Sequence, residues 1–287
     1  MNAVQLGPVG IWSMELRFGD KGEAAECAAE LDELGFGALW IPGGIDDAVL
    51  GDVDAYLAVS KRLAIGTGII NMWKQKPADI AAWWKTLPAD KQSRVMLGLG
   101  VSHGPIIGDA WKKPMALARD FLDEIAAAGL PPEAMCLAAL GPKMVALSGE
   151  RTAGAHPYLT TPEHTATARK ILGPGKLLAP EQGVVLESDP AKARQMAVEA
   201  LDHYRNLPNY RNNWLRIGFS QADIDTLSDR LIDGLFAWGG MDKIVERVKA
   251  HHDAGANHVC LQVIRGAMGG DIAGLRAACR ELADALL

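Results

Sequence analysis

The stretch "AAELDELGFGALWIP", residues 28–42, decides the fold. It begins as an amphipathic helix, stops at Gly35, and after two more residues becomes an apolar strand. A second stretch, "VKAHHDAGANHVCLQV" at residues 248–263, repeats this order near the other end of the chain. Helices that return to a strand through a glycine are typical of parallel α/β folds, so the two stretches predict such a unit at each end.

Short apolar runs recur between these ends, and each one predicts a strand. The runs occupy residues 9–12, 38–42, 63–70, 94–100, 134–140, 154–159, 177–186 and 258–264. They are continuous rather than alternating, which is typical of parallel strands covered on both faces. Eight such strands separated by helices predict a (β/α)₈ TIM barrel. A doubly wound sheet is the alternative, but it favours a GxGxxG after the first strand, and "GIWSMELRFG" at residues 10–19 lacks one.

We expect one domain over residues 1–287, interrupted by one insertion. The segment at about 207–241 is too long for a simple connection between the seventh and eighth strands. We interpret it as a helical insertion that lies over the barrel mouth, where it could act as a lid.

Composition limits the partners. The 29 Lys and Arg residues against 35 Asp and Glu residues give a net charge of −6 without a basic run, which argues against a nucleic-acid partner. No apolar stretch approaches the roughly 20 residues of a membrane span, and the N-terminus does not resemble a signal peptide. The four cysteines form no CxxC pattern, which argues against disulfides and structural zinc. We therefore expect a cytoplasmic protein with a small-molecule substrate and no membrane partner.

The barrel prediction locates the site at the carboxyl ends of the strands. The residues expected there are rich in glycine and apolar side chains and poor in acids, which suits a flat, apolar ligand. We expect no metal, because the first strand offers no His-x-His and because His103, His156 and Glu181 are isolated in sequence. This argues against a metal-dependent hydrolase.

Five stretches together carry a resemblance to a known family. They are "LGFGALWIP" (34–42), "LAIGTGIINMW" (63–73), "RVMLGLGVSHGP" (94–105), "LAALGPKMVALSGERTAGAHPYL" (137–159) and "LLAPEQGVVLESDPAKAR" (177–194). In this order they resemble the bacterial luciferase-like superfamily of flavin and deazaflavin oxidoreductases. Within it, the sequence is most similar to the actinobacterial branch that uses coenzyme F420.

The resemblance implies how a cofactor would be held. The third strand would end in a non-proline cis peptide, Gly68 to Ile69, lying against the middle of the ring. Asn71 would face the ring's polar edge, although it could instead cap the following turn. The loop 140–143 would hold the phosphate near a helix start. The cofactor-binding residues expected in all are Gly43, Gly68, Ile69, Asn71, Gly100, Val101, Leu140, Gly141, Pro142, Lys143 and His156.

His103 is the catalytic candidate, because it occupies a position where some relatives carry a proton-donating glutamate. An imidazole can donate or relay a proton near neutral pH, although a loop histidine could instead simply bond to the backbone. Gly98 and Gly100 would leave room for the ring. Trp12, Trp73, Glu181 and Gln182 are the expected substrate contacts. Pro42-Gly43-Gly44 stands where several relatives carry polar groups, which would open the pocket to a larger substrate.

The function that this resemblance implies is hydride transfer between coenzyme F420 and an organic substrate, in a homodimer. The alternative is an FMN-dependent monooxygenase of the same superfamily. A third hypothesis, suggested by the missing polar groups at Gly43 and Gly44, is a protein that binds the deazaflavin without turnover.

Overall fold

The computed structural model describes residues 4–43, 46, 48–108, 111, 113–265 and 271–287. Its strands are β1 (Val9–Trp12), β2 (Ala38–Ile41), β3 (Ala64–Thr67), β4 (Ile70–Asn71), β5 (Val95–Gly100), β6 (Met135–Leu137), β7 (Gly154–Ala155), β8 (Leu177–Leu178), β9 (Glu181–Val185), β10 (Phe236–Trp238) and β11 (Val259–Val263). The first α-helices are α1 (Glu15–Phe18), α2 (Lys21–Leu34), α3 (Val49–Val59), α4 (Pro77–Thr86), α5 (Ala89–Gln92), α6 (Gly104–Ile107), α7 (Pro114–Ala127) and α8 (Pro142–Arg151). The remaining helices are α9 (Pro162–Leu172), α10 (Pro190–Leu201), α11 (Pro208–Arg216), α12 (Gln221–Thr226), α13 (Asp229–Leu235), α14 (Met241–Asp253) and α15 (Ile272–Leu286), with 3₁₀ turns η2 (Pro132–Ala134) and η3 (Tyr204–Asn206).

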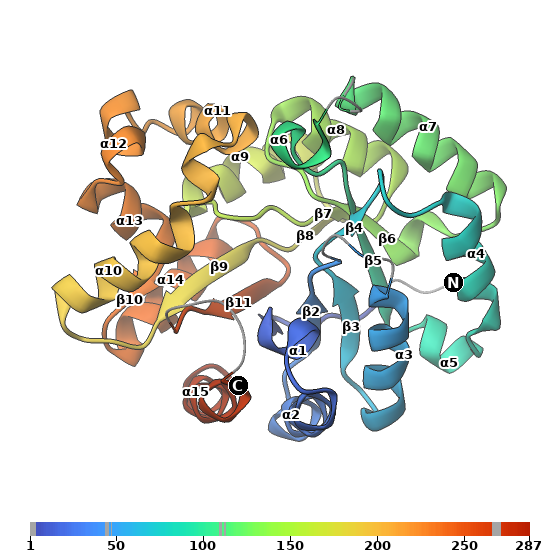
Figure 1. The fold of residues 1–287 in the computed structure, drawn as a ribbon, viewed down its shortest axis with the longest axis horizontal. Helices are drawn as coiled ribbons and strands as arrows, with labels where there is room; N and C mark the ends of the chain where they lie inside the picture. Colours follow the sequence, from blue (N-terminus) through green and yellow to red (C-terminus); the bar gives the residue numbers. More distant parts are fainter. Residues whose placement is uncertain (1–3, 44–45, 47, 109–110, 112, 266–270) are drawn as a thin grey trace.

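The strands form a parallel sheet that curls into a barrel (Figure 1). Their order is β10-β9-β11-β1-β2-β3-β5-β6-β7-β8, and β4 pairs with β5. The segment 177–185 closes the ring, because its amides at Ala179 and Glu181 donate to Ala155 and Pro157 while its carbonyls at Leu178 and Pro180 accept from Asn257 and Cys260. Each of the eight predicted runs contains a strand, and the predicted barrel is confirmed.

The segment 207–241 is only partly the helical insertion that the sequence predicts. It does form α11, α12 and α13, but these are followed by β10, which pairs in parallel with residues 183–185 at the carboxyl end of β9. The apolar residues "LFAW" at 235–238 are buried or half-buried, as a sheet position requires. The predicted excursion therefore also extends the sheet.

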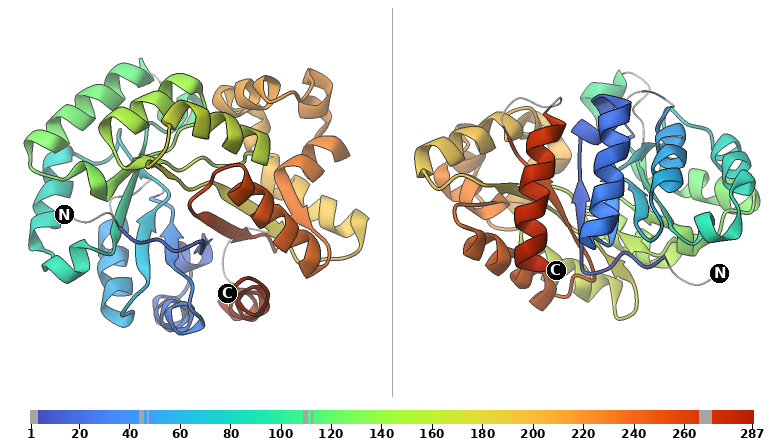
Figure 2. Two further views of the ribbon diagram at one scale, coloured as in Figure 1. Left: turned by 180° about the vertical axis from the view of Figure 1, so that it is seen from behind. Right: turned by 90° about the horizontal axis from the view of Figure 1, so that it is seen from below.

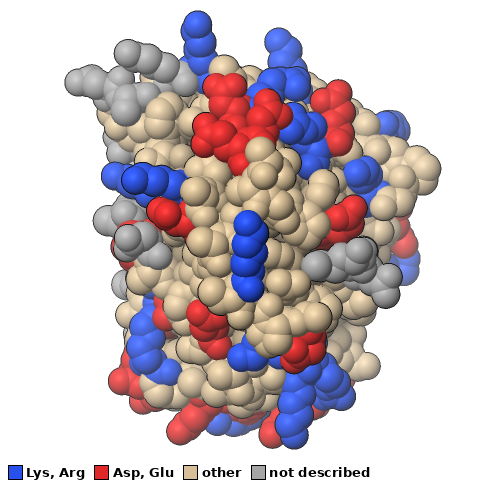
Figure 3. Space-filling view, turned by 90° about the vertical axis from the view of Figure 1, so that its right-hand side faces the viewer, with Lys and Arg blue, Asp and Glu red and all other residues tan. Residues whose placement is uncertain are grey.

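The helices surround the barrel, and the last helix, α15, packs against α2. Figure 2 shows α15 beside α2, where Arg276 forms ion pairs with Glu26 and Glu30 of α2. On the face drawn in Figure 3, acidic and basic side chains are interspersed among uncharged ones. Within the described residues, no helix combines the length and apolar character needed to cross a membrane.

The barrel interior is filled by large rings that pack against glycines. Trp40 of β2 is fully buried, and a Cβ at Gly66 of β3 would lie 2.4 Å from its Cε3. The Trp40 indole N–H donates to Nε2 of His258 (3.0 Å), and the His258 Nδ1 donates to the Gly7 carbonyl (2.9 Å). Position 66 therefore requires glycine, because any side chain there would overlap the Trp40 ring.

The strand β9 also buries a carboxyl group, that of Glu181. Its Oε2 accepts a hydrogen bond from the Leu159 amide (3.0 Å), whereas its Oε1 is buried without a partner among the described residues. Burial raises the pKa of Glu181 from 4.5 to about 8, although the Leu159 amide opposes this effect. The side chain is therefore mostly protonated at neutral pH.

Replacing Gly66 with Ala should destabilise the barrel, because the new methyl group overlaps the Trp40 ring. Overpacking of this kind costs about 1–3 kcal/mol of unfolding free energy, to be measured by urea denaturation. Gly51→Ala is the matched control, because Gly51 lies on the exposed face of α3 with no atom within 4 Å of an added Cβ. That variant should gain about 0.5–1 kcal/mol. Equal effects of the two substitutions would contradict the packing argument.

Replacing Glu181 with Gln should change how stability depends on pH. Between pH 4.5 and about 8 the unfolded carboxyl loses its proton while the folded one keeps it. The wild-type unfolding free energy should therefore fall as pH rises through this range, by up to about 1.4 kcal/mol per pH unit. Urea denaturation at several pH values should show that the unfolding free energy of Glu181→Gln rises relative to that of the wild type from pH 5 to pH 8. A constant difference between the two proteins would contradict the raised pKa.

Candidate functional site

A cavity of about 700 Å³ opens at the carboxyl ends of the strands. Its floor comes from the ends of β1, β3, β5, β6 and β7, and one side of its wall comes from η3 and α11. The sequence-predicted residues that line it are Trp12, Gly68, Ile69, Asn71, Gly100, Val101, His103, Leu140, Gly141 and His156. The fold therefore brings together most of the predicted site, from five separate strand ends.

The Gly68–Ile69 peptide on the cavity floor is cis, as the resemblance predicts. The Ile69 carbonyl accepts a hydrogen bond from the Gly43 amide (3.1 Å), and a Cβ at Gly43 would lie 2.3 Å from that oxygen. Gly43 does not line the cavity; it supports the peptide that does. Gly44 lies outside the described residues.

The space beside Gly98 and Gly100 goes to the chain itself, which corrects the prediction that it is reserved for a ring. A Cβ at Gly98 would lie 2.0 Å from the Thr67 carbonyl oxygen, and one at Gly100 would lie 2.7 Å from Cγ1 of Ile69. Both glycines thus allow the strand end around the cis peptide to pack against β5. Gly100 also lines the cavity.

Asn71 both caps a turn and faces the cavity. Its Oδ1 accepts from the Trp73 amide (3.0 Å), which is the turn-capping alternative. The residue also lines the cavity and is 5% exposed, so its Nδ2 is available as a donor there.

His103 lies on the loop between β5 and α6 and lines the cavity. Its Nδ1 is 3.1 Å from Oδ1 of Asn209 on α11, and its ring packs against Tyr210 with centroids 5.4 Å apart. Burial lowers the pKa of His103, partly opposed by the bond to Asn209, so the neutral imidazole is favoured. Its partners are therefore side chains of the inserted segment rather than the backbone.

His156 and Trp12 both lie close to Gly68, where an added Cβ would be 2.3 Å from Nε1 of Trp12 and 3.1 Å from Nε2 of His156. The His156 Nδ1 donates to the Ala179 carbonyl (2.7 Å), and its ring stacks on Trp40 with centroids 4.3 Å apart. Burial lowers the pKa of His156 to about 4. The imidazole is therefore neutral, with its lone pair on Nε2. The Trp12 indole N–H is buried without a partner among the described residues.

The loop 140–143 is the start of α8. Gly141 is the N-cap, no side chain caps the helix, and Pro142 occupies its first turn. Of the first three residues of α8, Lys143 has the amide left for an anion, because Pro142 has no N–H and the Met144 amide donates to the Gly141 carbonyl (3.0 Å). Leu140 and Gly141 line the cavity, whereas Pro142 and Lys143 do not.

Three predicted substrate contacts do not reach the cavity: Trp73, Glu181 and Gln182. Trp73 donates its indole N–H to the Val101 carbonyl (2.7 Å), behind the cavity wall. Gln182 donates to the carbonyls of Gly183 and Leu235 and lies 3.0 Å from Nε2 of His251. Like Glu181, it is fully buried. The two are consecutive in β9 and so point to opposite faces of the sheet, Glu181 to Leu159 and Gln182 to His251 of α14.

Sequence reasoning missed an aromatic wall, which we define as Tyr158, Tyr204 and Tyr210. Their rings contact one another, with centroids 5.0–6.3 Å apart, and all three line the cavity. The repeated tyrosines of "YRNLPNY" at 204–210 are the only sequence signal for it. Arg216 is the one lining residue with a permanent charge in the described part of the chain.

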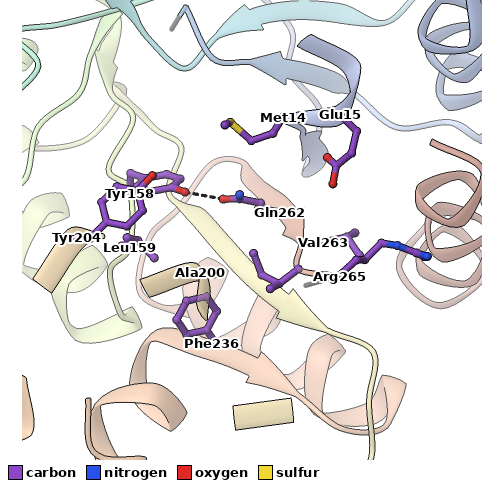
Figure 4. A pocket seen from close by; sticks show the side chains of 11 residues that line it. Met14, Glu15, Tyr158, Leu159, Ala200, Tyr204, Phe236, Gln262, Val263 and Arg265 are labelled. Atoms are coloured by element: carbon purple, nitrogen blue, oxygen red, sulfur yellow. Dashed lines mark hydrogen bonds between the residues drawn. The ribbon is translucent and has the colours of Figure 1, made fainter. Parts of the chain in front are cut away.

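A second, water-sized cavity of about 20 Å³ lies behind this wall (Figure 4). There the Tyr158 hydroxyl donates to Oε1 of Gln262 (2.7 Å), so it points away from the large cavity. The large cavity consequently meets the face or edge of this ring. Among the described residues, no group of three or more His, Cys, Asp or Glu side chains could hold a metal ion.

Comparison with known proteins gives a family match and a set of structural matches. Residues 8–129 match the family described as luciferase-like monooxygenase. No protein of curated function matches the sequence. An F420-dependent secondary alcohol dehydrogenase in complex with an F420-acetone adduct is similar in structure, with a TM-score of 0.71, 16% identity, and coverage of 98% of this chain and 99% of that one.

Two further structures match with similar TM-scores, sequence identities and coverage. The coenzyme F420-dependent tetrahydromethanopterin reductase from Methanopyrus kandleri has a TM-score of 0.65 and 15% identity, over 99% of both chains. The FMN complex of the oxygenating constituent of 3,6-diketocamphane monooxygenase from Pseudomonas putida has a TM-score of 0.66 and 13% identity, over 98% of this chain and 99% of that one. The barrel is thus shared over nearly the full length, and the match of β1 through α7 to the luciferase-like monooxygenase family confirms the resemblance seen in the sequence.

Proposed function

We propose that this protein is an oxidoreductase that binds coenzyme F420 and passes a hydride between the deazaflavin and a small organic substrate. The match of residues 8–129 to the luciferase-like monooxygenase family supports the oxidoreductase class, because a monooxygenase is an oxidoreductase. The two F420-dependent neighbours support the choice of cofactor.

The observation that carries the proposal is the composition of the large cavity. Its described lining is mostly glycine, apolar and aromatic residues, with Arg216 as the one permanent charge and no carboxylate, so a flat and mostly uncharged ring can enter it. The start of α8 lies at its edge without a side-chain cap, which suits the phosphate of the same molecule. A ring and an anion are the two parts of a flavin-type cofactor.

The residues present fit such a cofactor. The floor at Gly68 and Ile69 would support the ring, the Asn71 amide would donate to its polar edge, and Gly141 would let the phosphate approach the helix start. When bound, the deazaflavin supplies two-electron hydride chemistry. The chain would orient the substrate, exclude water and move a proton, for which His103 is the candidate.

An FMN-dependent monooxygenase is the second candidate, because an FMN-bound monooxygenase has the same fold. The same cavity and helix start would suit FMN equally well. Fluorescence titration of the purified protein with coenzyme F420 and with FMN distinguishes the two. Preference for F420 supports the proposal, preference for FMN favours the monooxygenase, and binding of neither contradicts both.

Asn71→Asp should weaken the affinity for coenzyme F420 at least tenfold, which corresponds to about 1.4 kcal/mol. Aspartate still accepts from the Trp73 amide but loses the Nδ2 donor and adds a negative charge where ring carbonyl groups would lie. Asn212→Asp makes the same chemical change at an exposed position on the cavity rim and should alter the affinity much less. The measurement is the dissociation constant from the same fluorescence titration. Equal affinities for the two variants would contradict this orientation of the ring.

A further inference from the structure

The contact between His103 and Asn209 joins two parts of the chain that are far apart in sequence and that both line the cavity. His103 belongs to the loop after β5, and Asn209 belongs to the first turn of α11 in the inserted segment. Both residues line the cavity, and Tyr210, next to Asn209, packs its ring against the imidazole. The orientation of His103 therefore depends on the position of α11.

The chemistry of this contact selects one tautomer of the imidazole. The atom that faces Nδ1 is the amide oxygen of Asn209, 3.1 Å away, and an amide oxygen only accepts hydrogen bonds. The proton of a neutral His103 must then be on Nδ1. Its Nε2 carries a lone pair and can accept a proton.

We propose that Asn209 is a positioning residue that holds His103 as the Nδ1-protonated tautomer, so that Nε2 acts as a proton acceptor. This role rests on the proposed function. A substrate that gives up a hydride from carbon to the redox cofactor also loses a proton from the attached hydroxyl or amine, and Nε2 of His103 takes that proton. The site would then favour substrates of the alcohol or amine class, which become a carbonyl compound or an imine.

The surroundings of His103 agree with a neutral resting state. Burial lowers its pKa, and the nearby His203 lowers it further, against the opposing effect of the bond to Asn209. The titratable groups that face it are His203, which precedes η3, and Tyr210 on α11, while Arg216 lies farther along α11 on the same cavity. None of these groups is a carboxylate that would hold His103 in its charged form.

The test is ¹⁵N NMR of the histidine side chains in the protein without added ligands. His103→Gln identifies the His103 signals among those of the seven histidines. In the wild type we expect the Nδ1-protonated tautomer and a pKa below the ordinary value. Asn209→Asp, which can only accept, should keep this tautomer and raise the pKa of His103 by about one unit. Asn209→Leu should lose the fixed tautomer.

Asn212→Leu is the matched control on the same helix and should leave both the tautomer and the pKa of His103 unchanged. Circular dichroism and thermal unfolding confirm that each variant is folded, and Asn209→Asp keeps the test valid if Asn209→Leu is not. A wild-type His103 protonated on Nε2, or a tautomer and pKa that do not respond to Asn209, would overturn the proposal. The experiment needs no cofactor, so its failure is distinct from failure of the F420 titration.

Discussion

The barrel depends on one stretch of backbone, residues 177–185, whose edges bond to different neighbours. Up to Glu181, amides of this stretch donate to carbonyls of the segment 153–157, and its carbonyls accept from amides of the segment 257–260. Beyond Glu181 the edge that faced β7 pairs with β10 instead. The hydrogen bonding between the β7 segment and β9 therefore stops before the carboxyl end of the barrel. The large cavity lies at this same end.

The end of this pairing explains two contacts of Leu159, one with Glu181 and one with Trp214. The buried Glu181 carboxyl bonds to the Leu159 amide, which has left the sheet at this point. Trp214 of α11 donates its indole N–H to the Leu159 carbonyl (3.1 Å). Side chains thus replace the main-chain pairing that ends here, and they fix α11 beside the cavity. Glu181 is thus held by a main-chain amide and does not line the large cavity.

The sequence predicts the strands and much of the cavity floor, because both follow from local patterns. A strand buried on both faces must be continuously apolar, and a parallel barrel places every strand end at one mouth. This rule is enough to place the ends of these strands, with Trp12, Gly68, Asn71 and His156, at the mouth, whereas the roles expected of these residues come from the family resemblance. The rule does not show why a given position is glycine. At Gly98 the missing side chain makes room for the Thr67 carbonyl and not for a ligand.

The remaining parts of the site depend on packing between segments far apart in sequence. Strand β10 is three residues long, and its apolar run could equally well end a helix. The partners of Gln182 depend on the register of β9, which no local pattern specifies. The aromatic wall comes from η3 and α11, whose position depends on Trp214 reaching across to Leu159. Nonlocal contacts of this kind leave only a composition signal in the sequence.

The buried histidines of the barrel differ from His103 of the cavity in the partners that hold them. His156, His164 and His258 each bond through one ring nitrogen to a main-chain carbonyl, and burial lowers the pKa of all three. The barrel backbone thereby fixes them as neutral groups. His103 differs because its partner is a side chain on α11, so a substitution in the insertion can change its protonation without disturbing the barrel. On our proposal, the fold sets the cavity floor, and the segment 207–241 between β9 and β11 sets the protonation of His103.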